Sequence, residues 1–368
     1  MNRNWRRLTV SLVGLAAACG MLILVSGCES MGGTSEAGSN MFAAGRGGYT
    51  ADLDEPSTRG LIKRVTPADF HVSWRFDVSP DGQKIVFSGY QSAASPVMDL
   101  WVVPATGGVA TKITSGTTDG MYSPSFTADG QHIVYESAGS LWMIRSDGAG
   151  GKRKIPGSGV GQDVNPDVNK DNILVFTSVQ QKALTANQLD YQAKLRAAGY
   201  SDDSVKEQMK AAGMPVERTY VVWTSTLDGG SLTQLREGTY PRWSPDGTHI
   251  VFVHQDDIWS IKADGTELTQ LTSTKDIQEG LPSYSADGKS ICFVSNEAHQ
   301  QGETESYNVF VMNVDGSNKT QVTELNCWNS WPLLTQDGLY FLSGRANDPA
   351  AEEKYTRIWG VSKADWLH

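Results

Sequence analysis

The stretch YPRWSPDGTHIVF, from Tyr240 to Phe252, decides how this chain of 368 residues is organised. A close variant, YSPSFTADGQHIVY, occurs earlier at Tyr122–Tyr135. Both contain Asp-Gly between two short runs rich in β-branched and aromatic residues. This is the strongest short-range signal for a β-hairpin, because glycine accepts the positive φ of a tight turn. The same setting recurs at intervals of 41 to 75 residues, at Asp81, Asp129, Asp246, Asp287 and Asp337, with Asn in place of Gly after Asp171.

Each copy of this repeat predicts two hairpins. In the copy that begins at Tyr240, THIVFVH and DIWSIKA follow the first turn, and a second turn, DGT, precedes LTQLT. Four-stranded units of roughly 40–45 residues are typical of propeller blades, which stack around a channel and bury aromatic residues between neighbours. We therefore expect most of the 11 tryptophans to pack between blades. A second register supports this alignment, because an aromatic residue lies five positions before the second turn's aspartate at Trp142, Trp223, Trp259 and Phe310.

The two ends of the repeat region predict how the ring of blades closes. The sixth copy stops after its third strand, RIWGVS at Arg357–Ser362. Before the first copy, LIKRVT at Leu61–Thr66 resembles the fourth strands TQLT and TQVT. Pairing these two segments would remove an exposed sheet edge. The sequence thus predicts an all-β fold, a six-bladed β-propeller over residues 59–368.

The first 27 residues have the pattern of a secretory signal, because three arginines precede an apolar run from Leu8 to Val25. The run is also long enough for an uncleaved membrane helix. The box VSGC, which ends at Cys28, resembles the cleavage box of bacterial lipoproteins and favours lipidation of Cys28. Such an anchor holds a protein on the membrane without spanning it. Glu29, in place of an aspartate, favours the outer membrane, with the protein facing the periplasm.

Residues 28–58 are rich in glycine, serine and alanine and predict a flexible tether. About 30 such residues have a typical reach of roughly 30 Å. The tether would hold the propeller off the membrane and leave it free to turn.

The longest insertion in the repeats lies at about residues 182–216, between the second and third strands of the third copy. Two stretches within it predict a helical hairpin. Leu184, Leu189 and Leu195 would supply part of an apolar face, and Ser201 or Asp202 would cap the second helix. Such a hairpin on the loop-rich face is interpreted as a lid over the channel, a docking arm for a partner, or an ornament.

Composition and motifs exclude several classes of function. The net charge is −10, and loss of the three arginines within residues 1–27 changes it to −13. An acidic body without a basic stripe argues against nucleic-acid binding. The chain has no G-x-S-x-G or H-E-x-x-H motif, and turn chemistry explains the repeated aspartates, so we expect no cofactor, no metal site and no enzyme activity.

Two cysteines, Cys292 and Cys327, remain in the propeller region. A disulfide is conceivable in an oxidising compartment. However, Cys292 lies in the strand position that Val134 and Val251 hold in their copies. This favours a small buried side chain and two free cysteines.

The innermost strand of each blade lies nearest the channel, and the residue after its proline faces the axis. A chain that needs only packing would not place Asp167 and Arg242 there, or Asp77 in the first copy, where Phe76 replaces the proline. Charges in a narrow channel lose hydration, so we expect them to pair with one another or to meet a ligand. Aromatic residues and arginine are frequent interface anchors. Above these charges we expect a rim that consists of Arg75, Asn165, Tyr240, Trp328 and Trp331.

The repeat RWSPDGTHIVF…DIWSIKADGTELTQLT resembles the WD40-like (PD40) propeller repeats of the TolB family, over about residues 59–368. The resemblance implies a periplasmic six-bladed propeller that binds partners, often through a segment that enters the channel mouth. TolB carries an α/β domain ahead of its propeller, where this chain has a tether. We therefore expect a lipid-anchored, non-catalytic scaffold for a protein or peptide partner. The alternative is an enzyme or a carbohydrate-binding propeller with its site in the channel.

The lipid anchor is tested by changing the residue that carries it. Replacing Cys28 by serine removes the thiol that would receive the lipid, so we expect Cys28→Ser to leave a soluble or unprocessed protein without acyl chains. Metabolic labelling with a radioactive or clickable fatty acid measures this. A variant that is labelled like the wild type would show that Cys28 is not the anchor.

Overall fold

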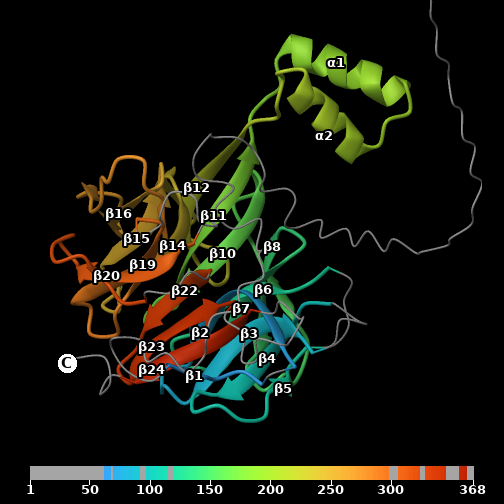
Figure 1. Cartoon of the computed structure of the whole chain (residues 1–368). Helices are drawn as coiled ribbons and strands as arrows, with labels where there is room; N and C mark the ends of the chain where they lie inside the picture. Colours follow the sequence, from blue (N-terminus) through green and yellow to red (C-terminus); the bar gives the residue numbers. More distant parts are fainter. Residues whose placement is uncertain are drawn as a thin grey trace, which may run out of the picture.

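Six four-stranded antiparallel sheets make up the fold. Figure 1 shows them arranged as blades around a common axis, and the first strand of each sheet contacts the first strands of its neighbours. The six-bladed β-propeller predicted from the repeats is therefore confirmed. The computed structural model describes residues 62–67, 69–91, 97–114, 119–297, 306–323, 328–344 and 356–362.

Blades 1 to 3 are each formed by four strands that follow one another in the sequence. Blade 1 contains β2 (His71–Val78), β3 (Lys84–Tyr90), β4 (Asp99–Pro104) and β5 (Thr111–Lys112). Blade 2 contains β6 (Tyr122–Phe126), β7 (His132–Ser137), β8 (Ser140–Arg145) and β9 (Arg153–Ile155). Blade 3 contains β10 (Gln162–Val168), β11 (Ile173–Gln181), β12 (Arg218–Thr226) and β13 (Thr233–Glu237).

Blades 4 and 5 follow the same plan, and blade 6 combines the two ends of the described chain. Blade 4 contains β14 (Thr239–Trp243), β15 (His249–His254), β16 (Asp257–Lys262) and β17 (Thr269–Gln270). Blade 5 contains β18 (Glu279–Tyr284), β19 (Ser290–Ser295), β20 (Asn308–Asn313) and β21 (Thr320–Gln321). Blade 6 contains β22 (Asn329–Leu334), β23 (Gly338–Ser343), β24 (Arg357–Ser362) and β1 (Ile62–Arg64).

The Asp-Gly turns between first and second strands are stabilised by their own side chains. In blade 1, Asp81 Oδ1 accepts hydrogen bonds from the N–H of Gln83 (3.0 Å) and the hydroxyl of Ser79 (2.5 Å), and Gly82 has a φ of 71°. Asp129 and Asp246 make the same pair of contacts in blades 2 and 4. Aspartate therefore satisfies the turn's N–H while glycine supplies the backbone angle.

The tryptophans of the third strands pack between blades, as predicted. Trp101, Trp142 and Trp259 are partly buried against three of the hydrophobic clusters, and Trp359 is only 4% exposed. Their role is therefore to fill the interior with a large apolar ring. The indole N–H groups donate to carbonyl oxygens near the end of the second strand, in the pairs Trp101–Gly89 (3.0 Å), Trp142–Ser137 (3.3 Å) and Trp259–His254 (3.1 Å).

The pairing of β1 with β24 closes the ring. Ile62, Lys63 and Arg64 lie opposite Val361, Gly360 and Trp359, which confirms the predicted closure for these residues. A second contact follows the pattern of other blades: the hydroxyl of Thr66 accepts the N–H of Ile358 (3.2 Å) across 292 positions of the sequence. Thr114 in blade 1 and Thr272 in blade 4 accept an equivalent N–H from Leu100 and Ile258, both at 2.9 Å. β1 thus takes the position of a fourth strand, and the threonine that follows it makes the same hydrogen bond as its equivalents in blades 1 and 4.

Two helices, α1 (Ala186–Ala197) and α2 (Asp202–Ala211), lie between β11 and β12. Figure 1 shows them standing away from the blades at the end of these two long strands. Thr185 caps α1 and Ser201 caps α2, each through a side chain that accepts a backbone N–H. The helices bury a small cluster of their own, so they form an arm with a separate core. Its members are Leu195, Val205 and Met209, with Leu184, Tyr191 and Val216 packed against them.

The apolar face of α1 differs from the prediction in one residue. Leu189 is 52% exposed, whereas Leu195 is buried as expected. Leu189 precedes Leu195 by six positions, which in a helix of 3.6 residues per turn points the two side chains to different faces. Neither helix in the described part of the chain has the length and apolarity needed to cross a membrane.

Cys292 is free and fully buried on β19, as predicted. The remaining sequence predictions about the N-terminal region concern residues outside the described ranges. These are the signal sequence at 1–27, the lipidated Cys28 and the tether at 28–58, and Cys327 lies outside them as well.

Closure by β1 is tested with two deletions. Removing residues 59–68 deletes β1 together with buried Val65 and Thr66, so we expect the free energy of unfolding to fall by at least about 3 kcal/mol. Removing residues 29–50 is the control, since the tether adds no predicted contact to the propeller. Thermal unfolding followed by circular dichroism measures both. Equal melting temperatures for the two deletions would contradict closure by this strand.

Candidate functional site

All six innermost strands carry a bulge that faces the channel. The pairing register of each innermost strand with the second strand of its blade shifts in mid-strand. A bulge bends a strand and re-aims its side chains. In blades 2 to 6 the residue before the strand's proline has a positive φ of 50–54°. These residues are Ser123, Asn165, Tyr240, Leu281 and Trp331.

Blade 1 departs from this pattern in a way that matters for the site. Ser73 lies opposite Ser88, and Phe76 lies opposite Phe87, so two extra residues, Trp74 and Arg75, are inserted in the bulge. The positive φ (66°) falls on Trp74, one position earlier than in the other blades. Arg75 is then turned inward and becomes fully buried, with 1% of its surface exposed.

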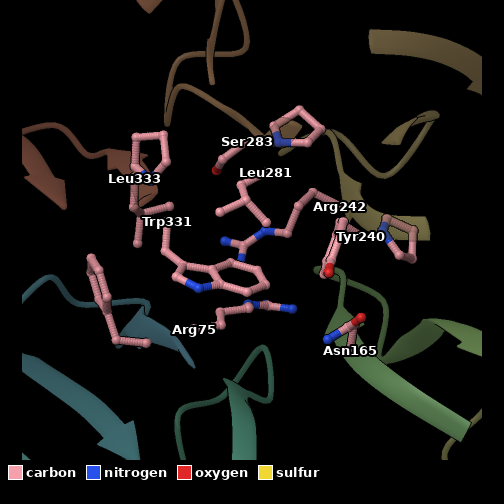
Figure 2. Close-up of a pocket in the computed structure, with 12 residues that line it drawn as sticks. Arg75, Asn165, Tyr240, Arg242, Leu281, Ser283, Trp331 and Leu333 are labelled. Carbon is pink, nitrogen blue, oxygen red and sulfur yellow. The ribbon is translucent and has the colours of Figure 1, made fainter. Parts of the chain in front are cut away.

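A narrow pocket lies where these bulges meet. Figure 2 shows Arg75, Arg242, Asn165 and Trp331 converging on it from different blades. Its enclosed space is about 10 Å³, roughly the room of one water molecule. The pocket is therefore the floor of an opening and does not enclose a ligand. The lining residues are Arg75, Phe76, Asn165, Tyr240, Pro241, Arg242, Leu281, Pro282, Ser283, Trp331, Pro332 and Leu333.

Charged side chains bridge the channel at this level. The guanidinium of Arg75 in blade 1 donates to the carbonyl of Pro166 and to the carboxylate of Asp167 in blade 3. Arg242 in blade 4 lies 3.8 Å from Asp77 Oδ1 in blade 1 and 3.6 Å from Asp167 Oδ1. Blades 1 and 4 are opposite one another in the ring, so these four residues span it. The channel charges thus pair with one another, which is one of the two outcomes expected from the sequence.

The position after the strand's proline also links neighbouring blades. Its side chain accepts a backbone N–H from the residue one place further along in the next blade. An aspartate or serine at this position is therefore explained by blade-to-blade bonding. The three bonds are Asp77 with Phe126 (2.8 Å), Ser125 with Val168 (3.3 Å) and Asp167 with Trp243 (2.8 Å).

Burial and charge pairing set the protonation of this cluster. Burial lowers the pKa of Arg75 to about 10, and the nearby Arg242 acts in the same direction. Burial raises the pKa of Asp77 and outweighs the attraction of the two guanidinium groups. Burial acts in the same direction on Asp167, but Arg242, Arg75 and the N–H of Trp243 together bring the pKa of this carboxyl below its usual value. Asp167 is thus the fixed negative charge of the channel.

Asn165 is held by a buried carboxyl group and keeps a free acceptor. Its backbone N–H donates to Glu136 Oε2 (2.6 Å), and its Nδ2 donates to the hydroxyl of Ser123 (3.3 Å). Burial raises the pKa of Glu136 to about 7. Asn165 is 1% exposed and lines the pocket, yet its Oδ1 has no hydrogen-bond partner among the described residues. A buried acceptor without a partner is costly unless water or a ligand supplies a donor.

The predicted rim is only partly assembled. Tyr240 and Trp331 line the pocket together, with ring centroids 5.4 Å apart in an edge-to-face arrangement. Arg75, expected at the entrance, is instead buried in the charged bridge, because the longer bulge of blade 1 turns it inward. Trp328 is not among the lining residues and packs against Tyr307, with centroids 4.7 Å apart.

Sequence reasoning missed two features of the mouth. Leu281 lines the pocket, and its position before a proline, shared with Asn165 and Tyr240, would have identified it. Trp74 forms an edge-to-face pair with Tyr122, with centroids 5.9 Å apart. No residue of α1 or α2 lines the pocket, so the interpretation of the hairpin as a lid finds no contact to support it.

The many aspartates of the repeats raise the question whether any of them form a metal site. Within the described ranges, no three His, Cys, Asp or Glu side chains are grouped as a metal site would require. The Asp-Gly aspartates are spread over separate turns and are bonded locally.

Comparisons with known proteins agree with the fold. A sequence model of the dipeptidyl peptidase IV N-terminal region, which is a propeller-type domain, matches residues 216–287. A search among curated protein sequences found no match. The matched segment runs from the end of blade 3 into blade 5 and is too short to assign the whole chain to that family.

Solved structures similar to this chain include both enzymes and non-enzymes. A gluconolactonase from Xanthomonas campestris superposes with a TM-score of 0.54 at 13% identity, covering 85% of this chain and 93% of the other. For an oligogalacturonate lyase from Vibrio parahaemolyticus the TM-score is 0.50 at 13% identity, with 85% and 96% covered. A putative TolB from Agrobacterium tumefaciens gives 0.48 at 18% identity, with 65% and 75% covered. The first two superpositions show that the chain shares the propeller fold with those proteins, and the fold alone does not specify function.

The buried carboxyl of Glu136 predicts a pH dependence of stability. Its pKa of about 7 lies above the usual carboxyl value near 4.3, so between these pH values the folded state holds the proton more tightly than the unfolded state. The free energy of unfolding should therefore fall as pH rises through this window. Glu136→Gln cannot ionise but keeps an oxygen for the N–H of Asn165. We expect the difference in free energy of unfolding between Glu136→Gln and wild type to shift by about 2 kcal/mol in favour of the variant from pH 5 to pH 8.

Urea unfolding at the two pH values measures this difference. The matched control is Glu207→Gln on the exposed side of α2. If wild type and Glu136→Gln show parallel stability curves, the carboxyl of Glu136 is not the titrating group.

Proposed function

We propose that this protein is a lipid-anchored, non-catalytic propeller scaffold that binds a protein or peptide partner at the mouth of its channel, in the periplasm. The observation that carries the proposal is the pocket itself. Aromatic rings and guanidinium groups converge there beside the unpartnered Oδ1 of Asn165. Aromatic residues and arginine are the side chains that most often anchor interfaces.

The state of the channel charges supports a binding role. A carboxyl group that acts as a general acid or base must be able to reach the substrate. Asp167 is bonded to Arg75 and to the N–H of Trp243, and Asp77 is bonded to the N–H of Phe126. These carboxylates hold the ring together and do not line the pocket.

The dimensions of the pocket support a partner that touches it from outside. Sites for small molecules usually enclose roughly 300–1,000 Å³. The enclosed space here is about 10 Å³. A segment that rests its end on this floor while contacting the surrounding rim fits these dimensions better than a small substrate that must be surrounded.

The anchoring part of the proposal rests on the sequence. The VSGC box that ends at Cys28 and the glycine- and serine-rich residues after it would tie the propeller to the outer membrane through a lipid and a flexible tether. Such an arrangement would let the channel mouth search for partners within a reach of roughly 30 Å.

The channel mouth is tested by photo-crosslinking in intact cells from Tyr240 and Trp331. Two exposed positions on the face of the Asp-Gly turns, Gln83 and Lys289, serve as controls. We expect discrete crosslinked partners from the mouth positions and few or none from the controls. Partners captured only from Gln83 and Lys289 would overturn the proposal. Products with sugar polymers at the mouth, in place of proteins, would favour a carbohydrate-binding propeller.

A further inference from the structure

Arg242 has a guanidinium group with unused hydrogen-bonding capacity. Its ion-pair partners are Asp77 Oδ1 at 3.8 Å and Asp167 Oδ1 at 3.6 Å, both beyond hydrogen-bond distance. Its side chain is 12% exposed, and Figure 2 shows the guanidinium pointing into the pocket. The neighbouring carboxylates hold the group in place by charge while its N–H donors remain open to a ligand.

The pocket surface is cationic, although the charges of the four-residue bridge beneath it, two arginines and two aspartates, balance one another. Among the described residues that line the pocket there are two arginines, Arg75 and Arg242, and no carboxylate. The oxygens of Asp167 and one oxygen of Asp77 are occupied by donors within the protein. A ligand that reaches the floor therefore meets N–H donors first, and its complementary group is an anion with a planar pair of acceptors, such as a carboxylate.

The channel is blocked directly below this floor. Arg242 and Asp77 come from opposite blades, and Arg75 with Asp167 joins blades 1 and 3. The charged bridge crosses the channel, since these side chains from blades 1, 3 and 4 lie within 4 Å of one another. An extended peptide that enters from the mouth cannot pass through, so it ends at the pocket or turns back.

We propose, resting on the proposed function, that the pocket receives the free C-terminal carboxylate of a partner peptide. The carboxylate accepts hydrogen bonds from Arg242, and the last peptide N–H donates to Asn165 Oδ1, the buried acceptor that lacks a partner. The last side chain rests against Trp331, Tyr240 and Leu281. An N-terminal ammonium would face the two arginines and is disfavoured by charge.

The test measures the affinity of defined probes for the purified full-length protein by isothermal titration calorimetry. The main pair is N-acetyl-Gly-Ala-Phe with a free carboxylate and the same peptide with a C-terminal carboxamide. N-acetyl-Gly-Ala-Glu-amide offers a side-chain carboxylate only, and digalacturonate offers a carboxylate on a sugar. We expect the free acid to bind roughly tenfold or more tightly than each of the other three.

Variants assign the preference to individual side chains. Arg242→Gln should abolish the preference for the free acid, and Arg242→Lys should reduce it, because lysine keeps the charge facing Asp77 and Asp167 but loses the paired donors. Asn165→Gly keeps the positive φ of the bulge and removes Oδ1, so it should weaken the binding of both the free acid and the carboxamide. Arg145→Gln, at an exposed position on β8, is the matched control and should leave the affinities for the free acid and the carboxamide unchanged.

The outcomes separate this inference from the proposed function. Equal binding of acid and amide, tighter binding of the Glu-amide or of digalacturonate, or no binding of any probe at millimolar concentration would overturn the C-terminal assignment. If crosslinks from Trp331 nevertheless capture a partner, the proposed function stands without it. Loss of folding in Arg242→Gln is recognised by its melting temperature, and Arg242→Lys then decides.

Discussion

The backbone pairing of β1 with β24 places segments from the two ends of the described chain in one sheet and turns a row of blades into a ring. Closing so long a loop costs conformational entropy that rises only slowly with length, while an open ring would leave a sheet edge unpaired. Closure also sets the geometry of everything at the centre. Only in a closed ring of six does blade 1 face blade 4, and only then can Arg242 approach Asp77. The charged bridge and the pocket above it therefore depend on the pairing of β1 with β24 in the outer part of blade 6.

At the axis, one repeat position serves two purposes. Its aspartate or serine bonds the next blade through a backbone N–H, and in blades 1 and 3 the same carboxylates also hold arginines across the channel. A buried ion pair is a weak contributor to stability by itself, but removing one partner leaves an uncompensated charge. The bridge therefore fixes the relative positions of the blades and leaves the guanidinium of Arg242, which is 12% exposed, facing the mouth. Similar propellers occur in enzymes such as the gluconolactonase and the oligogalacturonate lyase, so the fold alone does not assign a function to this chain.

The fold was predictable from the sequence because turn chemistry repeats locally. Asp81 and Asp246 bond within their own turns, so each copy can be recognised without its neighbours. The pairing of Arg242 with a channel aspartate was predictable because equivalent positions of the repeats lie at the same level around the axis. The inward turn of Arg75 was not, because it depends on a two-residue bulge that has no signature other than Phe76 in place of proline. Its partner, Asp167, lies 92 positions away.

Arg75 and Asp167 form one interacting unit that bridges the channel beneath the pocket. A double-mutant cycle of Arg75→Ala, Asp167→Ala and the double variant, with the free energy of unfolding from urea titrations, measures this directly. Each single change leaves a buried charge and should cost about 3–5 kcal/mol. The double variant should cost about 2–3 kcal/mol less than the sum of the two single losses. Additive losses, within about 0.5 kcal/mol, would contradict the bridge.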